Sequence, residues 1–292
     1  MKKKTGLGLI LAILLSTCVT AFASPVILDL ASGKNITFPE MIEGLRQARI
    51  VFLGDDITVP AHQLAQMQIL ETLHGENQEL AVAVEAFRGE SQYILDQWSS
   101  GEISKRRFVN EFNENWGEWE RYRPLYEYLR SNHIKLTGLN ISRDILIQVE
   151  MEGFDSLTPE QLEGLGEGII CDIEPGYQDV IRRLNLFKGM LQEHSFENFC
   201  ETKILGDIMM AKNLSKFQEE HPDLTVVVLA GNTHSWKLGI PRRLNAEAGL
   251  NPKTVLFEAE GMVTRNTVTI AETDYLWLDY GMDGWRYGPG QP

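Results

Sequence analysis

Acidic and imidazole side chains follow three separate apolar runs of this chain, and these residue types can do chemistry when they meet. Asp55, Glu85 and His234 each lie within four residues of the end of such a run. Two carboxylates and one imidazole in a single cleft can hold a divalent metal ion or act as general acid and base. The alternative for each of them is a solvated position on a surface loop.

The apolar runs determine where these side chains lie. Five short runs have the aliphatic and β-branched composition of strands buried on both faces of a parallel sheet: 49–53, 80–84, 134–139, 226–230 and 254–258. Helical spacing of apolar residues separates the runs, so we expect an α/β fold with a mainly parallel central sheet flanked by helices. Because the carboxyl ends of parallel strands share one edge, the three site candidates are expected in one cleft.

The segments between the predicted strands differ in length. Residues 24–280 are expected to form a single α/β domain, in which 88–133 and 151–205 are too long for simple crossovers. We interpret both segments as helical insertions over the carboxyl edge of the sheet. Residues 268–270 indicate an edge strand, and 281–292 read as an irregular tail. The first insertion is rich in aromatic residues, which favours a packed helical layer but would also suit a flat apolar ligand.

The beginning of the chain has the features of an export signal. Lysines at positions 2–4 precede an apolar run at 7–15 that is too short to span a bilayer, and 21–23 form an Ala-x-Ala cleavage site. We therefore expect residues 1–23 to be a signal peptide and the mature protein to be periplasmic. The alternative is a membrane-anchored lipoprotein, because a lipobox-like sequence ends in Cys18.

Charge and cysteine content limit the partners of the chain. The formal net charge of −14 at pH 7 opposes binding to nucleic acid or to an anionic membrane surface. Membrane association is expected only if the protein is lipid-anchored through Cys18. Cys171 and Cys200 would remain after cleavage of the signal, and they form either one disulfide in an oxidising compartment or two buried thiols.

Four motifs resemble those of the ChaN-like haem-binding uptake proteins and occur in the same order. They are Val51–His62, Val84–Phe87, Trp116–Pro124, and Ala230–His234 followed by Gly239–Leu244. The resemblance covers residues 48–258. It implies an exported, often lipid-anchored protein that binds haem and is linked to iron uptake, with cofacial haems held by tyrosine at a dimer interface. Haem is thus the expected ligand, and a homodimer is the expected assembly.

The candidate haem-binding residues come from the strand ends, from the aromatic insertion and from two helix starts: Asp55, His62, Glu85, Tyr122, Tyr126, Arg143, Asn232 and His234. Tyrosine and histidine can ligate haem iron, and an apolar, aromatic wall suits the porphyrin. For Tyr122 and Tyr126 the alternative is a place in the core or on the surface. His62 either faces the cleft or is solvated. Arg143 either pairs with a haem propionate or with Glu85, or it is a surface residue.

The family in turn resembles the Tiki-type metalloproteases and the erythromycin esterases, in which two Gly-x-x-His motifs and a glutamate mark the site. Here Glu85 is the glutamate and Gly231–His234 is the second motif, but the first motif, Gly54–Ile57, ends in isoleucine. An alkyl side chain cannot ligate a metal. The alternative function is a metal-dependent hydrolase with a degraded first motif, with Glu85 and His234 catalytic and with the metal ligands Asp55, Glu85 and His234. A third interpretation is a binding module whose site has decayed.

Overall fold

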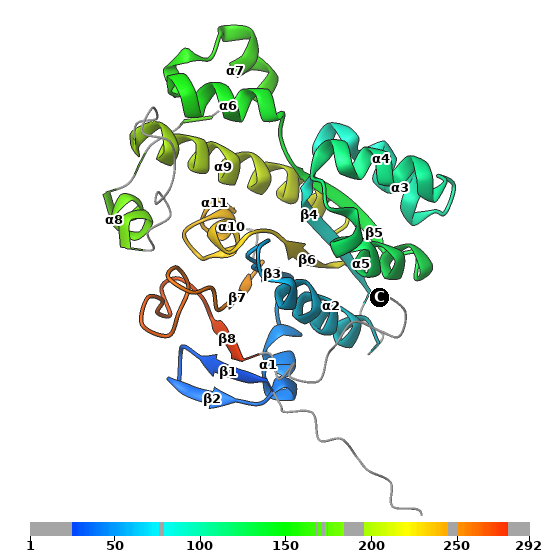
Figure 1. Cartoon of the computed structure of the whole chain (residues 1–292), viewed down its shortest axis with the longest axis vertical. Coiled ribbons are helices and arrows are strands. Elements are labelled where there is room, and N and C mark those ends of the chain that lie inside the picture. The colour runs from blue at the N-terminus through cyan, green and yellow to red at the C-terminus, as the bar shows by residue number, and fades with distance from the viewer. Residues whose placement is uncertain are drawn as a thin grey trace, which may run out of the picture.

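The computed structural model describes residues 25–75, 79–166, 169–170, 173, 175–183, 196–244 and 250–279. The expected signal peptide, Cys171 and the tail 281–292 lie outside these residues. The strands, shown in Figure 1, are β1 (Val26–Asp29), β2 (Lys34–Ile36), β3 (Ile50–Leu53), β4 (Leu80–Arg88), β5 (Lys135–Asn140), β6 (Thr225–Leu229), β7 (Lys253–Phe257) and β8 (Tyr275–Asp279).

The helices of the described residues alternate with these strands. They are α1 (Phe38–Leu45), α2 (Pro60–Gly75), α3 (Gln92–Ser99), α4 (Lys105–Asn115), α5 (Trp119–Ser131), α6 (Arg143–Glu152), α7 (Pro159–Leu165), α8 (Pro175–Arg183), α9 (Phe196–Glu220), α10 (Asn232–Ser235) and α11 (Ile240–Arg243). None of the helices in the described ranges is both long enough and apolar enough to cross a membrane. The Cys200 thiol in α9 is buried and forms no disulfide with another described residue. Because Cys171 is not described, the disulfide stays a prediction.

The eight strands form one mixed sheet in the order β2-β1-β8-β7-β3-β6-β4-β5. Neighbouring strands from β8 to β5 are parallel, whereas β1 is antiparallel to both β8 and β2. The α/β prediction is confirmed, but the sheet is mixed where a mainly parallel one was expected. The β1–β2 pair is antiparallel because a tight turn joins the two strands, and short turns can join only antiparallel neighbours. Gly33 in that turn has a φ of 68°, which glycine adopts without strain.

One predicted strand differs from the structure. Residues 268–270 lie in a loop and form no strand, and β8, a few residues further along, takes the place beside β7. The loop is held by its own side chains, because the Thr269 hydroxyl donates to the Glu272 carboxylate at 2.7 Å. The five runs predicted as buried strands correspond to β3, β4, β5, β6 and β7.

Helices cover both faces of the sheet. Helices α1 to α5 pack on one face in a single apolar cluster, in which Ile69 and Leu95 join Val84. On the other face, Met210 and Leu214 of α9 pack in one apolar cluster with residues of β3, β4 and β6. Figure 1 shows α2 and α9 on opposite sides of the central strands. Each fully buried aliphatic side chain contributes about 1.5–3 kcal/mol.

The first insertion, 88–133, forms the packed aromatic layer that its composition favours. The Trp98 and Phe108 rings stack with their centroids 3.9 Å apart, and Phe112 contacts the Tyr126 ring at 5.1 Å. The layer packs against β4 through Phe87, whose centroid lies 5.6 Å from that of Phe108. The α4–α5 segment thus also reaches the strand ends, where the candidate site lies.

Candidate functional site

The ends of three neighbouring strands bring the candidate residues together. Glu85, on β4, accepts a hydrogen bond through Oε2 from the backbone N–H of Gly231, just after β6, at 2.7 Å. The N–H of Asn232 donates to the backbone carbonyl of Asp55, just after β3, at 2.7 Å. His234 Nε2 lies 3.6 Å from Glu85 Oε1. The strand order β3-β6-β4 therefore places Asp55, Glu85 and His234 around one site, as sequence spacing indicated.

Two residues of helix α9 complete this site. Asp207 is fully buried, and its Oδ1 lies 2.6 Å from His234 Nδ1. Lys203 Nζ lies 2.7 Å from His234 Nε2 and donates to the Thr233 hydroxyl at 2.7 Å. Sequence reasoning missed both residues. Lys203 and Asp207 are four positions apart, so their spacing predicts only that both lie on one side of a helix.

The proton positions in this cluster follow from its charges. An ionised Asp207 accepts from His234 Nδ1–H, which leaves the Nε2 lone pair directed to Lys203. The other carboxylate oxygen, Asp207 Oδ2, accepts a hydrogen bond from the Tyr177 hydroxyl at 3.3 Å. Burial lowers the pKa of Lys203, and the carboxylates of Asp207 and Glu85 act in the opposite direction. The cluster therefore links the buried Asp207 carboxylate, through the His234 imidazole, to the partly buried Lys203 amine.

Asn232 joins the ends of β6 and β7 and does not point into the cluster. Its Nδ2 donates to the backbone carbonyl of Phe257 at 3.0 Å, and its Oδ1 accepts from the Phe257 N–H at 3.1 Å. Gly54 makes room for this amide, since a Cβ at that position would lie 2.2 Å from Asn232 Oδ1. The close contact between Gly54 and the Asn232 amide therefore fixes the position of the segment after β6 that carries His234.

The Asp55 carboxylate is buried beside the cluster. Its Oδ2 accepts from Gln63 Nε2 at 3.0 Å. Burial raises the pKa of Asp55 to about 7; the Gln63 hydrogen bond lowers it, and the nearby Glu85 carboxylate raises it further. Asp55 is therefore a carboxyl group that titrates near neutral pH, in the range useful to a general acid or base.

His62 braces the loop after β3 and is not solvated. Its Nδ1 accepts from the Asp56 N–H at 2.7 Å, and its Nε2 lies 3.1 Å from the Glu258 carbonyl. The ring is fully buried and stacks on Phe257. Burial lowers the pKa of His62 to about 4, so the ring is neutral at pH 7. Nearby Ile57, which ends the altered first motif, is 48% exposed.

The two candidate tyrosines line the inner wall of the strand-end cleft. Tyr122 and Tyr126 are both buried, and with Trp116 they border a cavity of about 20 Å³ next to Asp55 and Glu85. Burial raises the pKa of both tyrosines. Within the described residues the Tyr122 hydroxyl forms no hydrogen bond of normal geometry, although the Trp116 indole lies close enough to act against the rise of its pKa.

Arg143 lies apart from these groups. It is exposed in the first turn of α6, and within the described part of the chain no hydrogen bond or ion pair joins it to Glu85. The described residues also contain no group of three or more His, Cys, Asp or Glu side chains placed to hold a metal ion. The pairing of Arg143 with a haem propionate stays a prediction.

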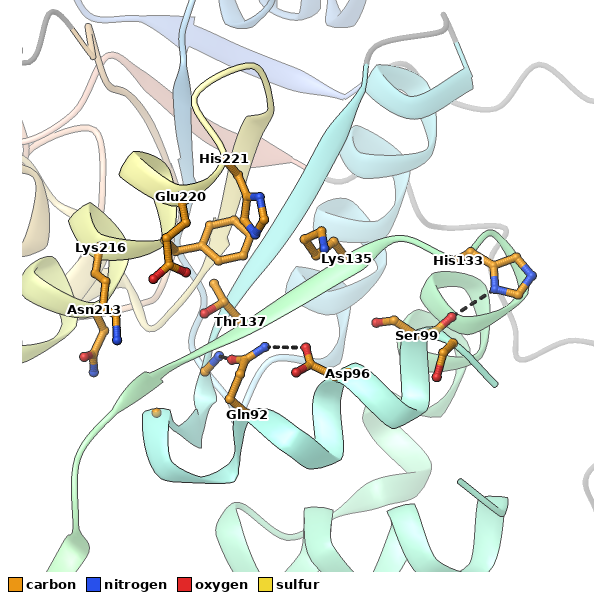
Figure 2. Close-up of a pocket in the computed structure, with 14 residues that line it drawn as sticks. Gln92, Asp96, Ser99, His133, Lys135, Thr137, Asn213, Lys216, Glu220 and His221 are labelled. Carbon is orange, nitrogen blue, oxygen red and sulfur yellow. Dashed lines mark hydrogen bonds between the residues drawn. The ribbon is translucent and has the colours of Figure 1, made fainter. Parts of the chain in front are cut away.

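A larger cavity lies along the open edge of β5. It has a volume of about 680 Å³ and runs between α3 and the end of α9, with Lys135, Glu220 and His221 around it (Figure 2). The Gln92 amide covers the strand edge here: it donates to the Leu136 carbonyl at 2.7 Å and accepts from the Gly138 N–H at 3.1 Å. One side chain thus takes the place of one residue of a neighbouring parallel strand.

Fold and site together define a class: an α/β protein whose polar cluster lies at the carboxyl ends of the central parallel strands, with helices on both faces. The particular family follows from the sequence comparison. Residues 41–244 match the model of the family described as "Haem-binding uptake, Tiki superfamily, ChaN". This chain belongs to that family, as its four motifs predicted.

Structural comparison agrees with that assignment. ChaN of Campylobacter jejuni, from a structure of cofacial haem binding, superposes with a TM-score of 0.67 at 21% identity, and the match covers 88% of this chain and 97% of that chain. Likeness at this identity shows the shared fold. An erythromycin esterase mutant in its open conformation gives a TM-score of 0.47 at 15% identity, with 80% of this chain and 76% of that chain covered.

One curated relative is a plant protein. Protein RETICULATA-RELATED 5, chloroplastic, of Arabidopsis thaliana is 29% identical over 260 residues, which are 80% of this chain and 34% of the relative. This chain therefore spans about a third of the length of that relative.

Proposed function

We propose that this chain binds haem as cargo and takes part in haem or iron uptake. The observation that carries the proposal is the family match over 41–244, which contains the strand-end cluster and the aromatic insertion. The fold shared with ChaN of Campylobacter jejuni, whose structure concerns cofacial haem binding, supports it. A homodimer that sandwiches two haems belongs to the same proposal, and light scattering with and without haemin tests it.

The two cavities differ in volume, and therefore in whether haem can fit without movement of the helices. The strand-end cavity of about 20 Å³ has room for about one water molecule, so a porphyrin can lie against Tyr122 only if α4 and α5 move away from the strand ends. The larger cavity along the edge of β5, here called the β5 groove, has a volume of about 680 Å³, which is the size of a ligand site. Its Lys135 and Lys216 side chains can pair with propionates, and the His221 imidazole can ligate iron.

Haemin titration with absorption spectroscopy tests the proposal. Wild-type protein is expected to give a saturable shift of the Soret band at micromolar haemin. Loss of this shift in Tyr122→Phe locates haem at the strand ends, and loss in His221→Ala locates it in the groove. Tyr128→Phe is the matched control, because Tyr128 lies on the same helix as Tyr122 but contacts His74. Absence of any saturable shift in wild-type protein refutes haem binding.

Export of the protein is part of the proposal and rests on the sequence features of residues 1–23. Cell fractionation and mass spectrometry of the mature amino terminus test it. A protein that begins at Ser24 in the soluble periplasmic fraction supports cleavage after the Ala-x-Ala site. Palmitate labelling that is lost in Cys18→Ala supports the lipoprotein alternative.

A second candidate function is hydrolysis, which the Asp207–His234 pair favours. A buried carboxylate that orients an imidazole, with a second carboxylate at 3.6 Å from the other ring nitrogen, is an arrangement suited to general base catalysis once the Lys203 amine has left that nitrogen. A panel of ester and amide substrates, with Glu85→Ala and His234→Ala as comparison, tests this function. Turnover that survives both substitutions would show that the cluster is not catalytic.

A divalent metal, as the wider group would use, does not fit the arrangement of these side chains. His234 Nε2 is the ring nitrogen that Asp207 leaves available, and a metal would lie about 2.0–2.1 Å from it. Lys203 Nζ already lies 2.7 Å from that nitrogen. No step of the proposed hydrolysis is therefore assigned to a metal.

A further inference from the structure

The hydroxyl of Thr233 and the amine of Lys203 form a pair that neither candidate function uses. Thr233 lies in α10, shortly after β6, and is half-buried. Its Oγ1 lies 2.7 Å from Lys203 Nζ. A hydroxyl within hydrogen-bond reach of a basic nitrogen is the geometry of an activated nucleophile, and an amine can be the base that activates threonine.

The surroundings of Lys203 favour the neutral amine that a base requires. Burial lowers the pKa of this amine, against the raising effect of the Asp207 and Glu85 carboxylates. Within the described residues no ion pair joins Nζ to either carboxylate, and each of them contacts His234 instead. The ammonium form therefore lacks a direct carboxylate partner that would hold its proton. A desolvated lysine of this kind can act as a general base.

His234 fixes the direction of the amine. Its Nε2 lies 2.7 Å from Lys203 Nζ, and Asp207 contacts the other ring nitrogen. With the Nδ1 proton held by Asp207, the Nε2 lone pair accepts an N–H of the amine, so the amine lone pair is available to the Thr233 hydroxyl. Helix α9 lies against the ring, because a Cβ at Gly206 would be 3.7 Å from His234 Cε1. These contacts form a continuous chain from the buried carboxylate to the threonine hydroxyl.

We propose that Thr233 is the nucleophile of an acyl-transfer reaction on small carboxylic esters, with Lys203 as its general base. The hydroxyl proton passes to Nζ as Oγ1 bonds to the acyl carbon, and Nζ returns the proton to the alcohol as the ester C–O bond breaks. Water then cleaves the acyl-threonine ester, which releases the carboxylic acid and restores the hydroxyl. The strand-end cavity reaches Gly231 and has a volume of about 20 Å³, so the acyl group is expected to be small.

This inference rests on hydrolysis, the second candidate function, and specifies a nucleophile for it. The base differs as well. General base catalysis by His234 needs the Lys203 amine to leave Nε2, whereas here the amine stays on that nitrogen and takes the proton itself. The two mechanisms therefore give opposite results when the threonine hydroxyl is removed.

Matched variants separate the hydroxyl and the amine from their structural roles. Thr233→Val removes the nucleophile and keeps the side-chain shape. Its control is Thr202→Val, because the Thr202 hydroxyl donates to a backbone carbonyl of α9 at 2.9 Å. Lys203→Arg keeps a positive charge and hydrogen-bond donors, but a guanidinium group cannot accept a proton. Its control is Lys212→Arg, because Lys212 lies on the same helix and donates to a backbone carbonyl of α7 at 2.8 Å.

Stopped-flow reaction with p-nitrophenyl acetate measures acylation directly. Wild-type protein is expected to release a burst of about one p-nitrophenolate per chain before slower turnover, the kinetic mark of an acyl-enzyme. Acid quenching and peptide mass spectrometry should place the acetyl group on Thr233, and hydroxylamine should remove it, because hydroxylamine cleaves esters and spares amides. Thr233→Val should lose the burst and the adduct, and Lys203→Arg should acylate about 10²–10⁴-fold more slowly. Both controls should match wild type.

Conservative variants keep the test informative if a substitution disturbs the fold. Thr233→Ser retains a hydroxyl, so it should retain the burst and carry the acetyl group at the same position. His234 is a positioning residue in this proposal. His234→Gln keeps an acceptor for the amine and should therefore acylate faster than His234→Ala.

The outcomes distinguish this inference from hydrolysis itself. A burst that survives Thr233→Val, a wild-type rate in Lys203→Arg, or a hydroxylamine-resistant acetyl group on Lys203 overturns the proposal. Turnover that persists in Thr233→Val without a burst leaves hydrolysis standing and refutes the threonine nucleophile. A Thr233 adduct without turnover supports the nucleophile and refutes hydrolysis. Wild-type protein that shows no burst, no adduct and no turnover refutes both.

Discussion

Asp55 and His62 are both buried near the strand ends, and they should change the free energy of unfolding in opposite directions as pH rises. Asp55 has its pKa raised from 3.8 to about 7, so the folded protein holds a proton that the unfolded chain releases. Its contribution is fully present below pH 3.8 and is lost as pH rises through 7. His62 has its pKa lowered from 6.5 to about 4, so the unfolded chain holds the extra proton. Its contribution is fully present above pH 6.5 and is lost as pH falls through 4.

The magnitude follows from proton linkage. One proton of difference between the two states changes the free energy of unfolding by about 1.4 kcal/mol per pH unit. Between about pH 4.5 and 6 each group should contribute about 1.5–2 kcal/mol, with a negative slope for Asp55 and a positive slope for His62. In wild-type protein the two contributions nearly cancel. Other titrating groups are common to the variants and drop out when each variant is compared with wild type.

Two substitutions separate these contributions. Asp55→Asn removes the negative slope, so its free energy of unfolding should rise with pH more steeply than that of wild type, by about 1 kcal/mol per unit. His62→Gln should show the opposite difference, and the double variant should run parallel to wild type. Urea unfolding at several pH values, with the same slope of free energy against urea in each protein, measures the effect. Parallel pH profiles for wild type and both single variants would refute the burial argument.

Three further substitutions have defined outcomes. Gly54→Ala places a Cβ against the Asn232 amide and should lower the free energy of unfolding by about 1–3 kcal/mol, measured by urea unfolding; an unchanged value would contradict the contact. Tyr122→Phe removes a buried hydroxyl without a normal hydrogen bond, so thermal melting should show equal or higher stability, about 0–1 kcal/mol, and a clear loss would reveal a hidden partner. Gln92→Leu uncovers the edge of β5 and should increase self-association in light scattering; an unchanged molecular mass would show that the edge is protected otherwise.

Strand positions were readable from the sequence because burial on both faces demands continuous apolar runs. Val226 to Ala230 is such a run, and the sheet buries it completely between β3 and β4. The convergence of Asp55, Glu85 and His234 followed, since parallel strands end at one edge. The β1–β2 hairpin was not predicted, because strands of four and three residues are too short to show a periodic pattern.

The partners of His234 were harder to predict, for a physical reason. Asp207 and Lys203 belong to a 25-residue helix that crosses the other face of the sheet, and its mixed polarity resembles that of a solvated helix. Sequence spacing shows that both residues lie on one side of α9, but it does not show that this side faces the end of β6. His62 shows the converse: a polar residue in a first helical turn is normally solvated, but here it is hydrogen-bonded to the backbone of the preceding loop at Asp56 and of a distant loop at Glu258.

The β1–β8 pairing has a consequence for the order of assembly. Ile27 lies opposite Trp277, so almost the whole chain separates two residues of one ladder. During synthesis from the amino terminus, the β1–β2 hairpin is made long before β8, so it can join the sheet only after β8 has been made. Such long-range closure is slow and comes late in folding. Truncations before β8 should therefore leave a collapsed core without the β7–β8 and β1–β8 ladders, and pulse-labelled hydrogen exchange should find β1 among the last segments to gain protection.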